Sequence, residues 1–208
     1  MKYDHIVFDI DGTLLNTEYA VLHSLRDALG RPNIPLKELE FVLGITGADA
    51  LRILSVKDIP ATLQLWLKNS HKYDDSITIF GGIEDLLHQL ALLGCKMGIA
   101  TSQTRAEFEA NKILSRIRPY FKTVICSDDT TGHKPTPEPL FKYMELAKTS
   151  NDKVLYIGDS KYDSECAQNA GVAFALAGWG SHDLTIPANY YFRNPMEAAE
   201  MLKDCHAV

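Results

Sequence analysis

Short apolar runs alternate with helical patterns over most of this 208-residue chain, and this alternation limits its possible folds more than any other feature. In the helical stretches, apolar residues recur three and four positions apart. The runs between them are Met97–Ala100, Val124–Cys126, Val154–Ile157 and Val172–Ala177. Alternating strands and helices form right-handed crossovers and a parallel sheet. The sequence therefore predicts a doubly wound, Rossmann-like α/β fold.

The first strand of this sheet is predicted at Ile6–Phe8, close to the N-terminus. It is followed by two carboxylates, Asp9 and Asp11, and then by Gly12 and Thr13. An Asp-Gly pair is common in ordinary turns, so the motif alone does not establish a site. Ligands of open α/β sheets, however, bind at the carboxyl ends of the strands. Two acids at that position indicate metal or acid/base chemistry.

The segment from Asn16 to Ser76 shows helical spacing and no strand pattern. We therefore expect a small all-helical cap, residues 16–76, inserted after the first strand of an α/β core formed by residues 1–15 and 77–208. The insert begins beside the two carboxylates, a position that suits a lid.

Local signals predict where several helices of the core begin and end. Thr104 and Glu107 can form a capping box for a helix that extends to Leu114. Thr136 is expected as the N-cap of a later helix, and Gly171 ends the next one. The last helix is expected to begin at Asn194.

The overall composition points to a soluble globular protein and not to a nucleic-acid or membrane protein. The hydrophobic content is 46%, and the net charge of −6 is unlike the basic surface of a nucleic-acid binder. No apolar run approaches the ~18 residues that span a bilayer, and the N-terminus does not resemble a signal peptide. Four scattered cysteines, without a close CxxC pair, fit free thiols in the cytoplasm.

Further polar side chains follow the later predicted strands. They are Thr101 and Ser102 after one strand, Lys134 in a loop, and Asp159 and Asp163 after another strand. These strand ends share one edge of a parallel sheet. Several carboxylates gathered there need positive charge, which Mg²⁺ can supply. Lysine, hydroxyl and backbone N–H groups, including those of Gly12 and Thr13, can bind phosphate oxygens.

These residues, in this order, resemble the motifs of the haloacid dehalogenase superfamily over nearly the whole chain. The first motif is Asp9–Thr13, the second is Thr101, the third is Lys134 before Pro135, and the fourth is Gly158–Asp163. The helical insert is similar to the cap of the phosphoglycolate phosphatase and β-phosphoglucomutase branch.

The resemblance implies a mechanism for a Mg²⁺-dependent phosphatase of a small phosphorylated metabolite. Asp9 would be the nucleophile and Asp11 the general acid and base. Asp9, Asp11 and Asp159 would hold Mg²⁺, with Asp163 orienting the metal shell or Lys134. Thr101 and Lys134 would hold the phosphoryl group. The expected partner is the metabolite alone, for a monomer or weak dimer.

Other interpretations of single residues stay open. Asp163 could be a surface acid at a helix start, and Lys134 a solvated loop charge. Gly44–Gly47 resembles a cap turn that faces the active site in this branch, so Thr46 and Arg52 are candidate specificity residues. His133 and Asp128 are weaker candidates for contact with the substrate and with the outer metal shell.

Three alternative functions also remain. A phosphomutase would use the same residues with a longer-lived intermediate. A phospho-accepting receiver domain combines similar groups, but it places the acceptor after a later strand. A retired, metal-binding member would act through a partner, and the intact motifs argue against it.

Overall fold

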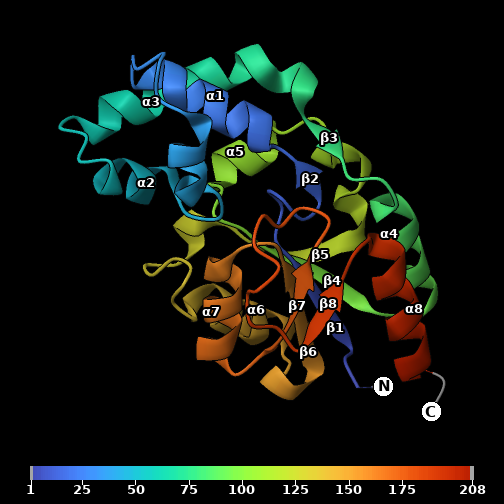
Figure 1. The fold of residues 1–208 in the computed structure, drawn as a ribbon. Coiled ribbons are helices and arrows are strands. Elements are labelled where there is room, and N and C mark those ends of the chain that lie inside the picture. The colour runs from blue at the N-terminus through green and yellow to red at the C-terminus, as the bar shows by residue number, and fades with distance from the viewer. Residues whose placement is uncertain (1, 207–208) are drawn as a thin grey trace.

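A six-stranded, fully parallel sheet forms the centre of the computed structural model, which describes the backbone of residues 2–206 and the side chains of residues 2–203. The strands lie in the order β5-β4-β1-β6-β7-β8 (Figure 1). Their bounds are β1 His5–Phe8, β4 Lys96–Ala100, β5 Phe121–Ile125, β6 Val154–Gly158, β7 Ala173–Ala177 and β8 Tyr190–Phe192. The α/β fold predicted from the alternating pattern is confirmed.

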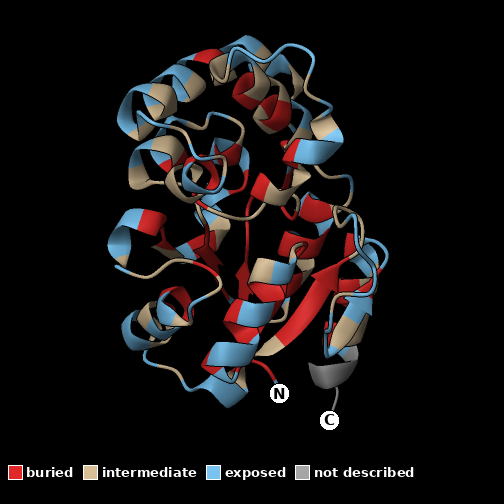
Figure 2. Ribbon diagram, turned by 60° about the vertical axis from the view of Figure 1, so that its left-hand side comes forward, coloured by how far each residue is buried: buried red, intermediate tan, exposed pale blue. Residues whose placement is uncertain are grey.

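Helices cover both faces of the sheet, with α6 and α7 on one side and α4 and α8 on the other (Figure 1). These helices, with the short α5, are α4 Ile83–Leu92, α5 Arg105–Ala110, α6 Glu138–Ala147, α7 Lys161–Ala170 and α8 Pro195–His206. Strand residues alternate between two apolar clusters: Phe8 packs on the α4 and α8 side, and Val7 on the α6 side. The two central strands β1 and β6 are buried along their whole length, and Figure 2 shows buried strands at the centre of the core. The apolar runs of the sequence follow from this two-sided burial.

The helical insert lies above the carboxyl edge of the sheet (Figure 1). It consists of α1 Glu18–Ala28, α2 Gly47–Ile53 and α3 Ile59–Ser70, with the 3₁₀ helices η1 Leu36–Val42 and η2 His71–Ser76. These elements share a small apolar cluster of their own, which includes Leu25, Leu39 and Leu51. A short antiparallel ribbon, β2 Leu15–Asn16 with β3 Thr78–Ile79, joins the insert to the core.

Several local signals predicted the helix ends correctly. Thr104 and Glu107 form the expected capping box, and Gly171 ends α7 with a left-handed φ of 65°. The side chain of Asn194 accepts hydrogen bonds from the N–H groups of Met196 and Glu197, as expected at the start of the last helix.

Other local predictions were wrong. The helix after Thr104 ends at Ala110, because the side chain of Asn111 accepts hydrogen bonds from the N–H groups of Ile113 and Leu114. Pro137, not Thr136, precedes the first residue of α6. The strand β8 and the ribbon β2–β3 were not anticipated, since each is too short to show a pattern.

A substitution of Gly98 in β4 can test how closely the sheet packs against α6. A Cβ atom at this position would lie 2.1 Å from the ring of Tyr143 and 2.8 Å from the carbonyl oxygen of Thr123. We predict that Gly98→Ala lowers the free energy of unfolding by about 1–3 kcal/mol, because the packed core must shift. Urea unfolding measures it. Gly81→Ala is the control, since nothing lies within 4 Å of a Cβ there; equal stability of the two variants would contradict the prediction.

Candidate active site

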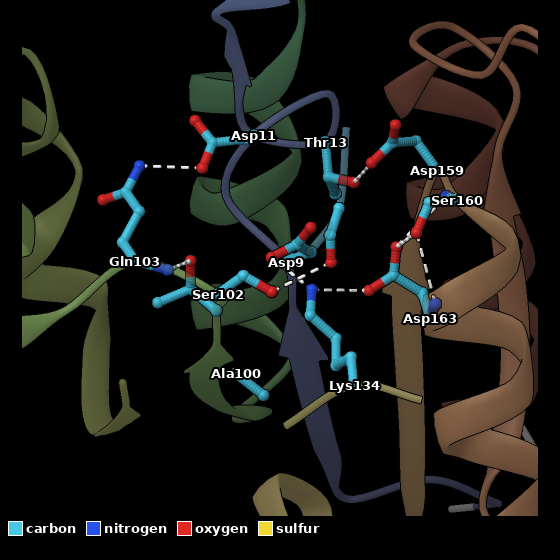
Figure 3. A network of polar contacts seen from close by, with 12 residues as sticks. Asp9, Asp11, Thr13, Ala100, Ser102, Gln103, Lys134, Asp159, Ser160 and Asp163 are labelled. Carbon is cyan, nitrogen blue, oxygen red and sulfur yellow. Dashed lines mark hydrogen bonds and ion pairs between the residues drawn. The ribbon is translucent and has the colours of Figure 1, made fainter. Parts of the chain in front are cut away.

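The carboxyl ends of the three central strands bring the predicted acids together. β1 lies between β4 and β6, and Asp9 directly follows β1. The N–H of Asp9 donates to the carbonyl of Ile157 at 2.9 Å, which fixes Asp9 beside the end of β6. Asp159 directly follows that strand. Figure 3 shows the side chains of Asp9, Lys134 and Asp163 meeting at this edge.

Lys134 is the buried cation of the site. Its Nζ lies 2.9 Å from Asp9 Oδ1 and 2.8 Å from Asp163 Oδ1, and the three side chains are at most 2% exposed. Burial alone would lower the pKa of Lys134, but Asp163 and Asp9 hold it above its ordinary value. The ammonium therefore stays charged and is fixed between two carboxylates.

Asp163 is held entirely by groups of the protein. Its Oδ1 accepts hydrogen bonds from Lys134 and, at 2.7 Å, from the hydroxyl of Tyr156. Its Oδ2 accepts from the N–H and the hydroxyl of Ser160. The bond from the Ser160 N–H, together with the bond from the N–H of Asp163 to Ser160 Oγ, forms the capping box of α7. Asp163 thus contacts Lys134 directly, as one of its two expected roles requires, and the role itself stays a prediction. Sequence reasoning missed Tyr156, since a tyrosine inside an apolar strand gives only a weak signal of a polar role.

Three carboxylates form a cluster whose geometry fits a divalent cation. Oxygen atoms of Asp9, Asp159 and Asp163 all lie within 4.8 Å of one another, and the three residues are buried. Burial raises the pKa of Asp9 to about 8, although Lys134 lowers it. Burial, and then the charge of Asp163, raises the pKa of Asp159 well above its ordinary value. One ammonium does not balance this cluster, so added positive charge would stabilise the ionised forms.

Gly12 and Thr13 contact neighbouring groups of the protein, while the phosphate contact predicted for them stays a prediction. Their N–H groups donate within the turn, to the carbonyls of Leu15 and Ile10. The hydroxyl of Thr13 donates to Asp159 Oδ1 at 3.1 Å. Gly12 has a φ of 76°, and a Cβ there would lie 2.2 Å from Asp159 Oδ2. Both residues therefore position Asp159, and only glycine leaves room for it.

Asp11 lies apart from the metal-type cluster, on the side of the loop that follows β4. Its Oδ2 accepts a hydrogen bond from the side-chain nitrogen of Gln103 at 2.8 Å (Figure 3). Burial raises the pKa of Asp11, and Gln103 opposes the rise. Thr101 is buried, and its Oγ1 accepts from the N–H of Gln103 at 3.2 Å. Gln103 was not singled out in the sequence, where only its place two residues after Thr101 could have marked it.

Residues expected to bind substrate instead join the insert to the core. Ser102 donates its hydroxyl to the carbonyl of Gly44 at 2.9 Å. Thr46 caps α2, and its hydroxyl donates to Asp49 at 2.6 Å. The same Asp49 carboxylate lies 3.2 Å from Nδ1 of His133 in the core and also pairs with Arg52. The structure shows these contacts within the protein, and the phosphate and substrate contacts expected of Ser102 and Thr46 stay predictions.

The weaker candidate Asp128 also lies away from the cluster. Its carboxylate accepts a hydrogen bond from the N–H of Arg105 at 2.8 Å.

No helix in the described part of the chain has the length and apolar character needed to cross a membrane.

Comparison with known proteins agrees with this geometry. The family model of haloacid dehalogenase-like hydrolases matches residues 6–177. Pyrophosphatase PpaX of Bacillus cereus is 29% identical over 184 residues, which cover 86% of this chain and 85% of that protein. PpaX-type sequences also include one from Caldanaerobacter subterraneus, 26% identical over 99% of this chain and 97% of that relative.

Solved structures share the whole architecture. A Lactobacillus plantarum protein that carries the provisional name phosphoglycolate phosphatase has a TM-score of 0.87 and 30% identity, over 97% of this chain and all of that one. CbbY from Rhodobacter sphaeroides, solved in complex with phosphate, has a TM-score of 0.79 at 18% identity, over 94% and 96% of the two chains, and shows similarity of fold alone.

The raised pKa of Asp9 predicts a pH-dependent stability for the metal-free protein. Its folded pKa of about 8 exceeds the ordinary 3.8, so the stabilisation from its bound proton is complete below pH 4 and is lost as pH rises towards 8. Asp9→Asn does not lose stability in this way, because its amide has no proton to release in this pH range. In EDTA, its stability relative to wild type should rise between pH 5 and 8, by at most about 1.4 kcal/mol per pH unit. Urea unfolding measures it, and a difference independent of pH would refute it. Asp85→Asn, on the exposed face of α4, is the control.

Proposed function

Since this chain belongs to the haloacid dehalogenase-like hydrolases, we propose that it is a Mg²⁺-dependent phosphatase that acts through an aspartyl-phosphate on Asp9. The observation that carries the proposal is the place of Asp9. It is a buried carboxylate at the end of the central strand, 2.9 Å from a fixed ammonium and within 4.8 Å of two further carboxylates. Its relatives are named as a pyrophosphatase and a phosphoglycolate phosphatase, and these names support phosphate chemistry.

The oxygen donors of the cluster fit Mg²⁺. This ion prefers oxygen ligands and is usually bound by only one or two protein carboxylates. We propose that the side chains of Asp9 and Asp159 and the main-chain carbonyl of Asp11 hold the ion, with Asp163 beside them. Thr13 and Gly12 keep Asp159 in place for this task. Bound Mg²⁺ supplies positive charge that neutralises the phosphoryl oxygens and the ionised carboxylates.

The residues of the chain then carry out two proton-linked displacements. In the first, an Asp9 oxygen bonds to phosphorus, the ester P–O bond breaks, and Asp11 gives its proton to the leaving oxygen. In the second, Asp11 takes a proton from water as the water oxygen bonds to phosphorus and the Asp9–phosphorus bond breaks. Lys134 stabilises charge on the transferred oxygens, and the Thr101 hydroxyl can donate to one of them.

The substrate we propose is a small phosphorylated metabolite, either phosphoglycolate-like or a sugar phosphate. The helical insert, residues 16–76, would act as a lid domain over the core, because Gly44 contacts Ser102 and Asp49 of α2 contacts His133 at the edge of the site. Such a cover leaves little access for a macromolecule. We propose a cytoplasmic protein, a monomer or weak dimer, whose buried thiols Cys126 and Cys166 stay protonated because burial raises the pKa of each to about 12.

Phosphate release from 4-nitrophenyl phosphate tests this proposal. Wild type with Mg²⁺ should turn over, and EDTA should abolish turnover reversibly. Asp9→Asn should lose at least about 10³-fold in kcat, because its amide cannot act as the nucleophile. Asp11→Asn should slow the second step and accumulate an acyl-phosphate that hydroxylamine cleaves. A panel of phosphoglycolate, sugar phosphates and pyrophosphate then identifies the substrate.

The control is Asp85→Asn, whose exposed carboxylate on α4 is distant in sequence from every motif and should leave turnover unchanged. Full activity of Asp9→Asn, or turnover in EDTA, would contradict the aspartyl-phosphate proposal. A phosphoenzyme that persists in water and transfers its phosphate to a sugar would favour the phosphomutase alternative.

A further inference from the structure

Gln103 carries a buried polar atom that the protein leaves without a partner. Among the described residues, three side-chain atoms are buried and form no hydrogen bond: Asp9 Oδ1, Thr17 Oγ1 and Gln103 Oε1. Asp9 Oδ1 has Lys134 as its ion-pair partner. Burial raises the pKa of Asp11, and the hydroxyl of Thr17 lies near enough to Asp11 to oppose this rise. Gln103 opposes it too. All three atoms therefore belong to the surroundings of Asp9 and Asp11, and Gln103 Oε1 is the one for which no interaction has been named.

The main chain of Gln103 is fixed on both sides. Its N–H donates to Oγ1 of Thr101 at 3.2 Å, and its carbonyl accepts from the N–H of Ser127 at 2.9 Å. The side chain then reaches Asp11 with its nitrogen, 2.8 Å from Oδ2 (Figure 3). An Oδ2 atom that carries no proton only accepts hydrogen bonds, so the amide nitrogen is the end assigned to face it.

A purely structural role does not account for an amide at this position. Burying the Oε1 atom without a partner costs free energy, and an apolar side chain of similar length, such as methionine, would avoid that cost. The side chain of Gln103 makes one hydrogen bond, and this bond goes to Asp11. The contribution of the amide at this position is therefore its hydrogen bond to the Asp11 carboxyl.

We propose that Gln103 is a positioning residue that holds the Asp11 carboxyl for proton transfer to the leaving-group oxygen. The inference rests on the proposed function, in which Asp11 is the general acid. Donation to Oδ2 fixes the carboxyl plane and leaves Oδ1 to carry the proton. As the Asp9–phosphorus bond forms and the ester bond breaks, that proton passes from Oδ1 to the leaving oxygen, which needs it most when the leaving group is poor.

The dependence on the leaving group tests this role. For wild type, Gln103→Met and Asp11→Asn, kcat/KM is measured with Mg²⁺ on 4-nitrophenyl phosphate, phenyl phosphate and propyl phosphate. This parameter reports the steps up to ester cleavage, whatever the rate of phosphoenzyme hydrolysis. Relative to wild type, Gln103→Met should lose about tenfold more on propyl phosphate than on 4-nitrophenyl phosphate, as part of the 10²–10⁴-fold that general acid catalysis supplies. Asp11→Asn should show a larger difference.

Three further measurements separate positioning from structure. The melting temperature of Gln103→Met should equal or exceed that of wild type, because the unpartnered amide oxygen is gone. Gln103→Leu should give the same leaving-group dependence. Adding Gln103→Met to Asp11→Asn should leave that dependence unchanged, since the group being positioned is absent. Gln168→Met, on the exposed face of α7, is the matched control.

An equal loss on all three esters in Gln103→Met, or no loss, would overturn the positioning role while Asp11→Asn still shows the steep dependence. If Asp11→Asn itself shows no such dependence, Asp11 is not the general acid. The proposed function is then at fault, and the role of Gln103 fails with it.

Discussion

The buried ammonium of Lys134, fixed between Asp9 and Asp163, is the interaction on which the site depends. Without it, two carboxylates would face each other inside the protein with no charge to oppose them, and one would have to take up a proton. The contact also joins three separate segments: the end of β1, the loop before α6 and the first turn of α7. The strand order, with β1 next to β6, is what allows these segments to meet.

The cluster of Asp9, Asp159 and Asp163 carries more negative charge than Lys134 balances, and this excess suits the binding of a divalent cation for phosphate chemistry. Asp9 and Asp163 share the single charge of Lys134, so the three carboxylates of the cluster, with Asp159, are not balanced. Burial raises the pKa values of Asp9 and Asp159, and the charge of Asp163 adds to the rise. A protein that lowered these pKa values with more lysines would be more stable when empty, but it would hold a divalent cation less well.

The sequence predicted the strand ends well, because an apolar run followed by Asp9, Asp159 or Thr101 fixes both the strand and the position of the acid or hydroxyl. It did not predict where hydroxyl and N–H groups point. Gly12 and Thr13 turn towards Asp159, and Ser102 towards Gly44, because the turn after β1 and the insert supply nearer partners than a phosphate. Such choices depend on tertiary contacts, which no residue spacing encodes. The contact of Gln103 with Asp11 is of the same kind.

The insert meets the core through contacts that would have to break if the insert moved as the proposed lid. Gly44 packs against Ser160 so closely that a Cβ would lie 2.6 Å from its hydroxyl oxygen, and Ser160 also caps the helix that carries Asp163. The position of the insert is thus linked through one serine to the carboxylate that orients Lys134. A lid movement of the kind proposed would break these contacts of the insert, whereas the ion pairs of Lys134 with Asp9 and Asp163 lie within the core and would stay formed.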